Sequence, residues 1–262
     1  MTAAVLAVHA GRVLSRLGPF VLVAALWQAA VLLHVADPEF LPGLGTIGAA
    51  LIDLVGSGSI FRDLGTTLLT AMAGLALGVC IGVPLGTAMA LSPAADGFFG
   101  PLIKATYSLP KSALVPLFVL LFGIGGLTNI LATVLTTLLP IVIYTYHGIH
   151  GVPRILIWSA RSMGTPDWKM LPRILLPSAS PAILTGIRIA LGFAFIVTIA
   201  AEMIVSNYGI GKQIFLFGSS GSYAYMFAAV LVIMLAAFAA DRILLLISDH
   251  LLRWLDPVDR DG

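Results

Sequence analysis

Charged residues are scarce in this sequence. Only 10% of its 262 residues are Asp, Glu, Lys or Arg, whereas a soluble domain carries about 25%. The chain therefore cannot cover a large solvated surface, which excludes an ordinary soluble globular protein. Its formal net charge of +2 is too small to indicate binding to DNA or RNA, so no nucleic-acid partner is expected.

Cysteine and nucleotide-binding motifs are almost absent as well. The single cysteine, Cys80, lies in a hydrophobic run, where we expect a small buried side chain that forms no internal disulfide. The only Gly-Lys pair, Gly211-Lys212, continues with Gln213 rather than Ser or Thr, so the phosphate-binding loop motif is missing. We therefore expect no ATP chemistry in this chain.

Metal-binding and catalytic clusters are not apparent either. His34, His147 and His150 lie at the ends of hydrophobic runs and lack metal-ligand spacing, so no metal site is expected. An intramembrane enzyme would need paired catalytic groups at one depth, such as Ser with His or two Asp. None is evident, and the chain is expected not to be an enzyme.

Long hydrophobic runs are the main feature that is present. A helix needs about 20 apolar residues to cross the hydrocarbon core of a bilayer. Six runs predict such spans, at 17–35, 64–91, 97–125, 126–149, 181–206 and 222–248. Residues 113–149 hold no Asp, Glu, Lys or Arg, and Gly123 to Gly126 is the expected turn between two helices. The fold class predicted is all-α, a polytopic membrane protein with six transmembrane helices.

The basic residues predict the orientation of these helices. With the N-terminus inside, 11 of the 14 Lys and Arg residues are cytoplasmic, two are outside, and Arg188 falls within a span. The cytoplasmic set is Arg12, Arg16, Lys104, Lys111, Arg154, Arg161, Lys169, Arg173, Arg242, Arg253 and Arg260. Such a bias predicts cytoplasmic N- and C-termini and a cytoplasmic segment 150–178.

The segment 150–178 is a polar, mixed-charge interruption between hydrophobic runs. Gly164 suits a left-handed position that ends one short helix, and Thr165 with Pro166 suits the start of another. Pro172 and Pro177 are expected to limit that second helix. The segment also carries the apolar side chains Trp158, Trp168, Met170 and Leu171. They favour either an amphipathic segment on the membrane surface or a helix that binds in a groove of a soluble partner.

This segment resembles the cytoplasmic "EAA" loop of ATP-binding-cassette importer permeases. That loop reads Glu-Ala-Ala, three residues, Gly, nine residues, then Ile-x-Leu-Pro. The positions that align with this pattern are Trp158, Ser159, Ala160, Gly164, Ile174, Leu176 and Pro177. The first two depart from the pattern, so a salt bridge from the usual Glu is not carried over. The resemblance implies that this segment, with Asp167 near the start of its second helix, is a coupling loop.

Further matches extend the resemblance over about residues 40–250. Residues 180–192, 201–203 and 209–211 are similar to the nitrate, sulfonate and taurine branch of these permeases. The resemblance implies one transmembrane domain, 1–262, with the type I importer fold in a bacterial inner membrane. It implies a homodimer, separate ATPase subunits that bind ATP and Mg, and an extracytoplasmic substrate-binding protein. This chain would bind no cofactor, and its substrate would be a small anion such as nitrate, a sulfonate or taurine.

Four polar residues inside the spans are candidates for a substrate path or gate: Glu202, Arg188, Asn129 and Thr133. Arg188 and Glu202 are 14 residues apart, about 21 Å of helical rise, so they cannot pair on one straight helix. Arg188 could instead anchor its helix at the cytoplasmic face. Glu202 could line the path or tie down the outer loop, and the hydroxyl of Thr133 could bond its own backbone.

Glycine recurs at every fourth position of the second run, at Gly74, Gly78, Gly82 and Gly86. On a helix this spacing forms one flat face that allows another backbone to approach closely, either within the chain or in a dimer.

Two alternatives stay open. The same type of importer could carry a vitamin precursor or an aromatic acid. An ATP-independent secondary transporter is disfavoured, because the two halves of the chain do not mirror each other in charge or proline placement.

Overall fold

The structure is a computed structural model that describes residues 18–37, 39–107, 109–205 and 207–254. Within these ranges the chain is helical and forms no β-strand. Both termini lie outside them, including Arg12, Arg16 and Arg260, as does residue 17 of the first expected span. The chain divides into two compact units, 1–61 with 213–232, and 62–212 with 233–262.

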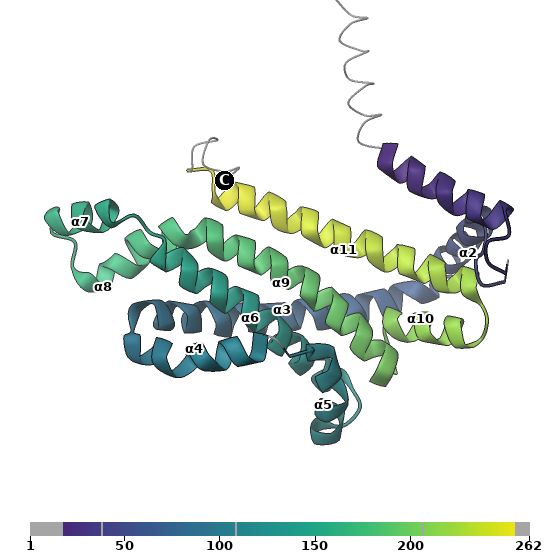
Figure 1. The fold of residues 1–262 in the computed structure, drawn as a ribbon, viewed down its shortest axis with the longest axis horizontal. Helices are drawn as coiled ribbons and strands as arrows, with labels where there is room; N and C mark the ends of the chain where they lie inside the picture. Colours follow the sequence, from purple (N-terminus) through teal and green to yellow (C-terminus); the bar gives the residue numbers. More distant parts are fainter. Residues whose placement is uncertain (1–17, 38, 108, 206, 255–262) are drawn as a thin grey trace, which may run out of the picture. The chain divides into compact units, whose positions relative to one another are not determined.

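Four of the described helical stretches are long and apolar enough to cross a membrane (Figure 1). They are α3 (Ser59–Leu91), α6 (Gly126–His150), the continuous stretch Asp167–Val205, and α11 (Tyr223–Leu251). They lie over four of the six hydrophobic runs. The first run holds a shorter apolar helix, Gly18–Leu32. Cys80 lies on the exposed side of α3, so its expected burial is wrong within this chain.

The expected span over 97–125 is not a single helix. The chain forms α4 (Pro93–Tyr107), a 3-10 turn η1 (Lys111–Leu114) and α5 (Val115–Phe122). Pro110 lacks an N–H and disfavours helix in the residue before it, whereas Pro116 stands in the first turn of α5, where no N–H is needed. Gly123 then ends α5 with a φ of 79°, at the turn expected from the sequence.

This break changes the position of Lys111. The residue was counted among the cytoplasmic charges, but its side chain lines a pocket together with residues 136–144 from the middle of α6. Removing it leaves ten cytoplasmic basic residues against two outside (11 − 1 = 10), so the predicted orientation is unchanged.

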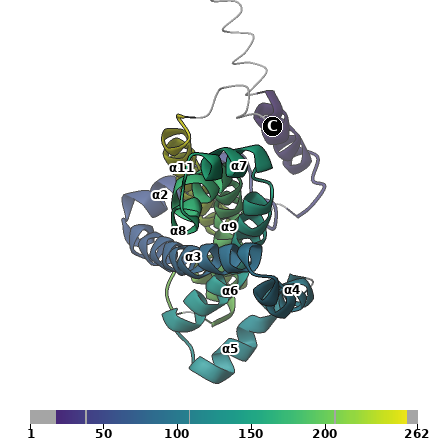
Figure 2. The ribbon, with the colours of Figure 1, turned by 90° about the vertical axis from the view of Figure 1, so that its left-hand side faces the viewer.

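The second unit is built on α3, α6 and α9 (Leu176–Val205), which lie side by side (Figures 1 and 2). The four glycines of α3 face α6 of the same chain. A Cβ at Gly82 would lie 2.8 Å from Cγ2 of Ile141, and one at Gly86 would lie 2.7 Å from the carbonyl oxygen of Val142. Because such distances leave no room for a side chain, the glycine face allows the two helices to approach closely.

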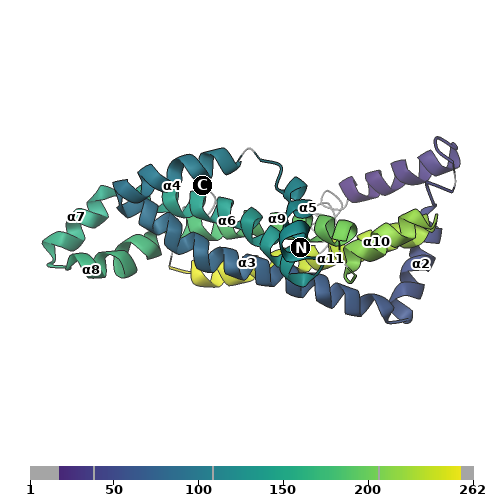
Figure 3. The ribbon, with the colours of Figure 1, turned by 90° about the horizontal axis from the view of Figure 1, so that it is seen from below.

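Small residues also bring α6 and α9 together. A Cβ at Gly148 would lie 2.8 Å from the Cβ of Ala182, and one at Gly186 would lie 2.6 Å from the Cβ of Tyr144. At the end of α6 the chain enters α7 (Arg154–Ser162) and α8 (Asp167–Met170), which lie at one end of this unit, with α5 toward the opposite end of α6 (Figures 1 and 3).

The first unit has its own contacts. It contains the helix Gly18–Leu32, α2 (Leu44–Gly56), most of α10 (Ile210–Ser219) and the start of α11. The ring of Trp27 packs edge-on against Phe227 at 5.1 Å, and its Nε1 donates to the carbonyl of Pro42 at 3.1 Å. The Tyr225 hydroxyl donates to Asp53 at 2.9 Å. These contacts link segments that are far apart in the sequence.

Candidate functional site

The segment between α6 and α9 folds on a small core of its own. Ala160 on α7 is 1% exposed and packs with Val152, Met170 and Leu175. Because Ala160 is almost fully enclosed, a larger side chain at position 160 would have to displace these apolar neighbours. The Ala of the EAA pattern therefore has a packing role in this structure.

A tight turn joins α7 to α8. Gly164 has a φ of 78°, its N–H donates to the carbonyl of Arg161 at 2.9 Å, and the N–H of Thr165 donates to Ala160 at 3.0 Å. This pair of bonds is the Schellman arrangement, in which glycine takes the left-handed position. The expected Thr165 cap does not form, since Pro166 precedes the first residue of α8 and no side chain caps it.

The second helix does not stop at its prolines, contrary to expectation. Residues Leu171–Leu175 form a π-helical turn, η2, in which the N–H of Leu176 donates to the carbonyl of Leu171. Pro172 and Pro177 lack the N–H groups that an α-helix needs, and around them the chain takes the wider π-helical pattern and does not end. As a result α8, η2 and α9 form one helical stretch, Asp167–Val205.

The outer face of this segment is rich in large exposed side chains. Trp158 is 58% exposed, Met163 78% and Trp168 73%. Arg161 pairs with Asp167 at 3.6 Å on the surface, and Lys169 lies over the ring of Trp168. Of the other expected coupling residues, Ser159 and Pro177 are exposed, while Ile174 and Leu176 are half-buried. Exposed aromatic and Met side chains, such as those of Trp158, Met163 and Trp168, are typical of a protein-binding surface.

A polar cluster lies at the far end of α9. The carboxylate of Glu202 accepts a hydrogen bond from the Thr67 hydroxyl at 2.8 Å and one from the Gly211 N–H at 3.0 Å. The N–H of Ile210 donates to the Thr67 hydroxyl oxygen, and that of Gly209 to Asp63. Through these hydrogen bonds Glu202, which lies on α9 and is 1% exposed, ties the start of α10 to α3.

Glycine is required beside this carboxylate. Gly209 has a φ of 103°, and a Cβ there would collide with the carboxylate of Glu202. A Cβ at Gly211 would collide with the carbonyl of Ile199. The two glycines thus allow the backbone N–H groups at the start of α10 to reach buried acceptors.

Glu202 and Asn129 also share a small pocket of about 130 Å³. In the described part of the chain, Oε1 of Glu202 and Oδ1 of Asn129 are buried without a hydrogen-bond partner. Thr66, Thr70 and Asn207 contribute to the same lining. Two unpartnered acceptors can take hydrogen bonds from a water molecule or another small donor.

The other two candidates for the path, Thr133 and Arg188, do not line this pocket. The Thr133 hydroxyl donates to the carbonyl of Asn129 at 2.8 Å and lies 2.9 Å from the Thr198 hydroxyl, so it links α6 to α9. Arg188 forms two hydrogen bonds with Asp241 on α11, at 2.7 and 3.0 Å. The structure therefore places Glu202 and Asn129 in one pocket, with Thr133 one turn along α6 from Asn129 and outside the pocket lining, whereas Arg188 pairs with α11 instead.

Sequence reasoning missed the partners of these residues. Asp241 pairs with Arg188 across 53 positions, and Thr67 with Glu202 across 135. Spacing within one helix carries no signal for such pairs. The presence of one acid and one base in two different hydrophobic runs was the only available sign for Arg188 and Asp241.

Comparison with known proteins gives consistent similarities. The family described as "Binding-protein-dependent transport system inner membrane component" matches residues 78–257. The chain is 30% identical to the taurine transport system permease protein TauC of Escherichia coli (strain K12), over 91% of this chain and 88% of that protein. It is also 30% identical to the putative aliphatic sulfonates transport permease protein SsuC of Bacillus subtilis (strain 168), over 88% and 83%.

A solved structure shows the same fold. An inward-facing conformation of the MetNI methionine ABC transporter superposes with a TM-score of 0.63 at 18% identity, covering 74% of this chain and 94% of that chain.

Proposed function

Because this chain belongs to the binding-protein-dependent transport system inner membrane components, the permease subunits of ATP-driven importers, we propose that residues 158–177 couple it to its ATPase subunits. The family works with ATPase and binding-protein partners, and the chain is a transport subunit rather than an enzyme. The proposal assigns ATP and Mg to the partner ATPase and no cofactor to this chain.

The observation that carries this proposal is the continuity of α8 with α9. The exposed face of α7 and α8 is held by its own buried core around Ala160, and α8 continues through η2 into a helix that ends near Glu202. A force on α8 can therefore move α9 along its whole length. A flexible loop in this place would absorb the same force without moving the helix.

The proposed substrate is a small organic sulfonate such as taurine, or another small anion such as nitrate. The relatives named as taurine and aliphatic sulfonate permeases support this class, since the similarity covers most of each chain. We further propose that two identical copies enclose the path in a bacterial cell membrane, with cytoplasmic termini. The excess of basic residues on the α7–α8 side supports this orientation.

The coupling proposal predicts that exposed aromatic residues of this segment bind the ATPase. Trp158→Ala and Trp168→Ala should each lower substrate-stimulated ATP hydrolysis and co-purification with the ATPase about tenfold or more, as expected for buried aromatic anchors of an interface. The thermal unfolding temperature of the permease should not change, because both side chains are exposed in the isolated chain. Activity is measured on the complete importer in proteoliposomes.

The matched control is Phe98→Ala, which removes an aromatic side chain that is 66% exposed on α4. It should leave co-purification and stimulated hydrolysis unchanged. Full ATPase binding by both Trp variants would contradict the proposal.

A further inference from the structure

Lys111 is a charged residue at the level of the middle of two membrane-spanning helices. It lines a pocket with Thr136, Leu139 and Tyr144 of α6, which begins at Gly126 and ends at His150. Thr136 is ten residues from the start of α6, or about 15 Å along the helix. A charge at such a depth is costly to keep, and marks substrate or ion pathways in membrane proteins.

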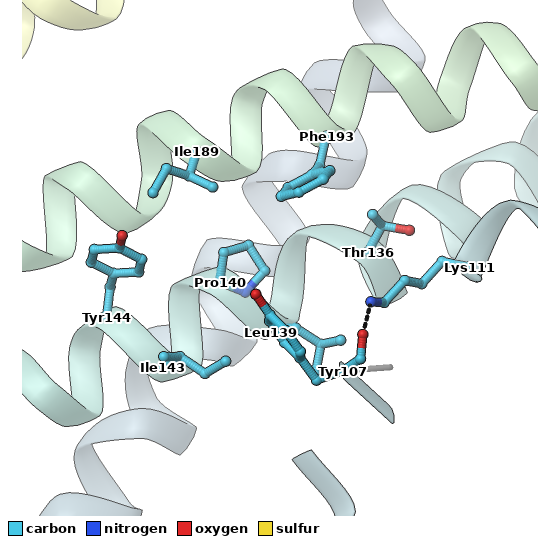
Figure 4. Close-up of a pocket in the computed structure, with 9 residues that line it drawn as sticks. All are labelled: Tyr107, Lys111, Thr136, Leu139, Pro140, Ile143, Tyr144, Ile189 and Phe193. Atoms are coloured by element: carbon cyan, nitrogen blue, oxygen red, sulfur yellow. Dashed lines mark hydrogen bonds between the residues drawn. The ribbon is translucent and has the colours of Figure 1, made fainter. Parts of the chain in front are cut away.

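The pocket has the size of a small-molecule site. Its volume is about 430 Å³, and pockets for small molecules span roughly 300–1,000 Å³. Figure 4 shows Ile189 and Phe193 of α9 on one side, Pro140 and Leu139 of α6 on the other, and Lys111 and Tyr144 toward opposite ends. Hydrocarbon side chains therefore form the walls, and one ammonium group supplies the charge.

No carboxylate balances this ammonium group in the described part of the chain. Its Nζ donates to the carbonyl of Tyr107 at 2.6 Å and lies 5.3 Å from the centre of the Tyr107 ring. Among the pocket-lining residues none is Asp or Glu. The two remaining N–H donors of Lys111 are therefore available to an anion that enters from the pocket.

We propose that this pocket is a transient binding site for an organic anion on the transport path, with Lys111 facing the acid group and Leu139, Ile189 and Phe193 facing the hydrocarbon part. This inference rests on the proposed function and narrows its substrate class. An inorganic anion such as nitrate would use the ammonium group but gain nothing from the apolar walls. An alkyl or aryl sulfonate would use both.

The test is ATP-driven uptake by the complete importer, with its ATPase and binding protein, in proteoliposomes. The probes are 2-aminoethanesulfonate and 1-butanesulfonate. Lys111→Gln should lower the uptake rate of the transported sulfonate about tenfold or more, the loss expected when a charge-assisted hydrogen bond to a ligand disappears. Lys111→Arg should restore most of the rate. The matched control is Lys104→Gln, which removes the same charge from α4 outside this pocket.

Two variants of Phe193 test the same pocket even if Lys111→Gln does not fold. Phe193→Glu and Phe193→Gln replace a side chain that is 43% exposed and differ only in charge. The Glu variant should import the sulfonate about tenfold more slowly than the Gln variant, because its carboxylate would pair with Lys111 and repel the anion.

The outcomes separate the two proposals. If the wild-type importer carries neither sulfonate, the substrate proposed above is wrong. If the wild-type importer carries one of them, the pocket is not an anion site when two results hold together. Phe193→Glu and Phe193→Gln import the sulfonate at equal rates, and an assembled Lys111→Gln importer takes it up as fast as Lys104→Gln. The proposed function would then still stand. Slower uptake by Lys111→Gln and Phe193→Glu supports the inference.

Discussion

At the scale of single residues, the clearest result is that a buried carboxylate joins three helices. Glu202 accepts hydrogen bonds from Thr67 of α3 and from the backbone N–H of Gly211 at the start of α10. From the sequence it was equally plausible as a path-lining residue. Its two protein partners favour the structural role, while its second oxygen faces the small pocket shared with Asn129.

This role predicts a stability change. Glu202→Ala should lower the free energy of unfolding by about 1–3 kcal/mol, because it leaves the buried N–H of Gly211 without an acceptor, whereas the Thr67 hydroxyl can still donate to the carbonyl of Asp63. Glu202→Gln should lose less, because both bonds reach one carboxylate oxygen and an amide oxygen in that place can still accept them. Thermal unfolding in detergent measures both. Equal unfolding temperatures for wild type and Glu202→Ala would show that the carboxylate does not tie the helices.

At the scale of helices, close packing depends on glycine where two backbones meet. The stripe on α3 was foreseen from its spacing of four, since that spacing places the glycines on one face. Packing within the same chain was the favoured prediction, but the sequence could not name the partner helix, because a flat face can also pack against a helix of another copy. The structure places α6 against it.

This contact predicts a difference between two glycines of one helix. Gly86→Ala should destabilise the permease by about 1–3 kcal/mol, because its Cβ would lie 2.7 Å from a backbone carbonyl that cannot move easily. Gly65→Ala, also on α3, has nothing within 4 Å of its Cβ and should be neutral or slightly stabilising. Thermal unfolding of the two variants compares them directly, and equal losses would contradict the packing described for α3 and α6.

Helix boundaries show where reasoning from the sequence fails. Long apolar runs predicted α3, α6 and α11 within a few residues, because about 20 apolar residues suffice to indicate a span. Pro172 and Pro177 were expected to end a helix, yet a π-turn carries the chain through them. Hydropathy also merged α4 and α5 into one span, since it does not register the bend at Pro110. That merger concealed the position of Lys111.

At the scale of the whole molecule, the chain is the transport subunit of an importer and depends on another subunit for its energy. Its family and its fold are those of ATP-driven importers, in which a separate subunit hydrolyses ATP. The surface that we assign to the ATPase and the pocket that we assign to the anion both lie on elements that contact α9 or continue into it. Movement of this helix is therefore the proposed link between ATP hydrolysis and release of substrate.

The most direct test of this account is the uptake of a labelled sulfonate by proteoliposomes that contain the permease with or without its ATPase. With the ATPase, binding protein and ATP present, uptake against a gradient is predicted, and it should stop when ATP is replaced by a non-hydrolysable analogue. The permease alone should show no uptake under an ion gradient. Concentrative uptake by the permease alone would contradict the account.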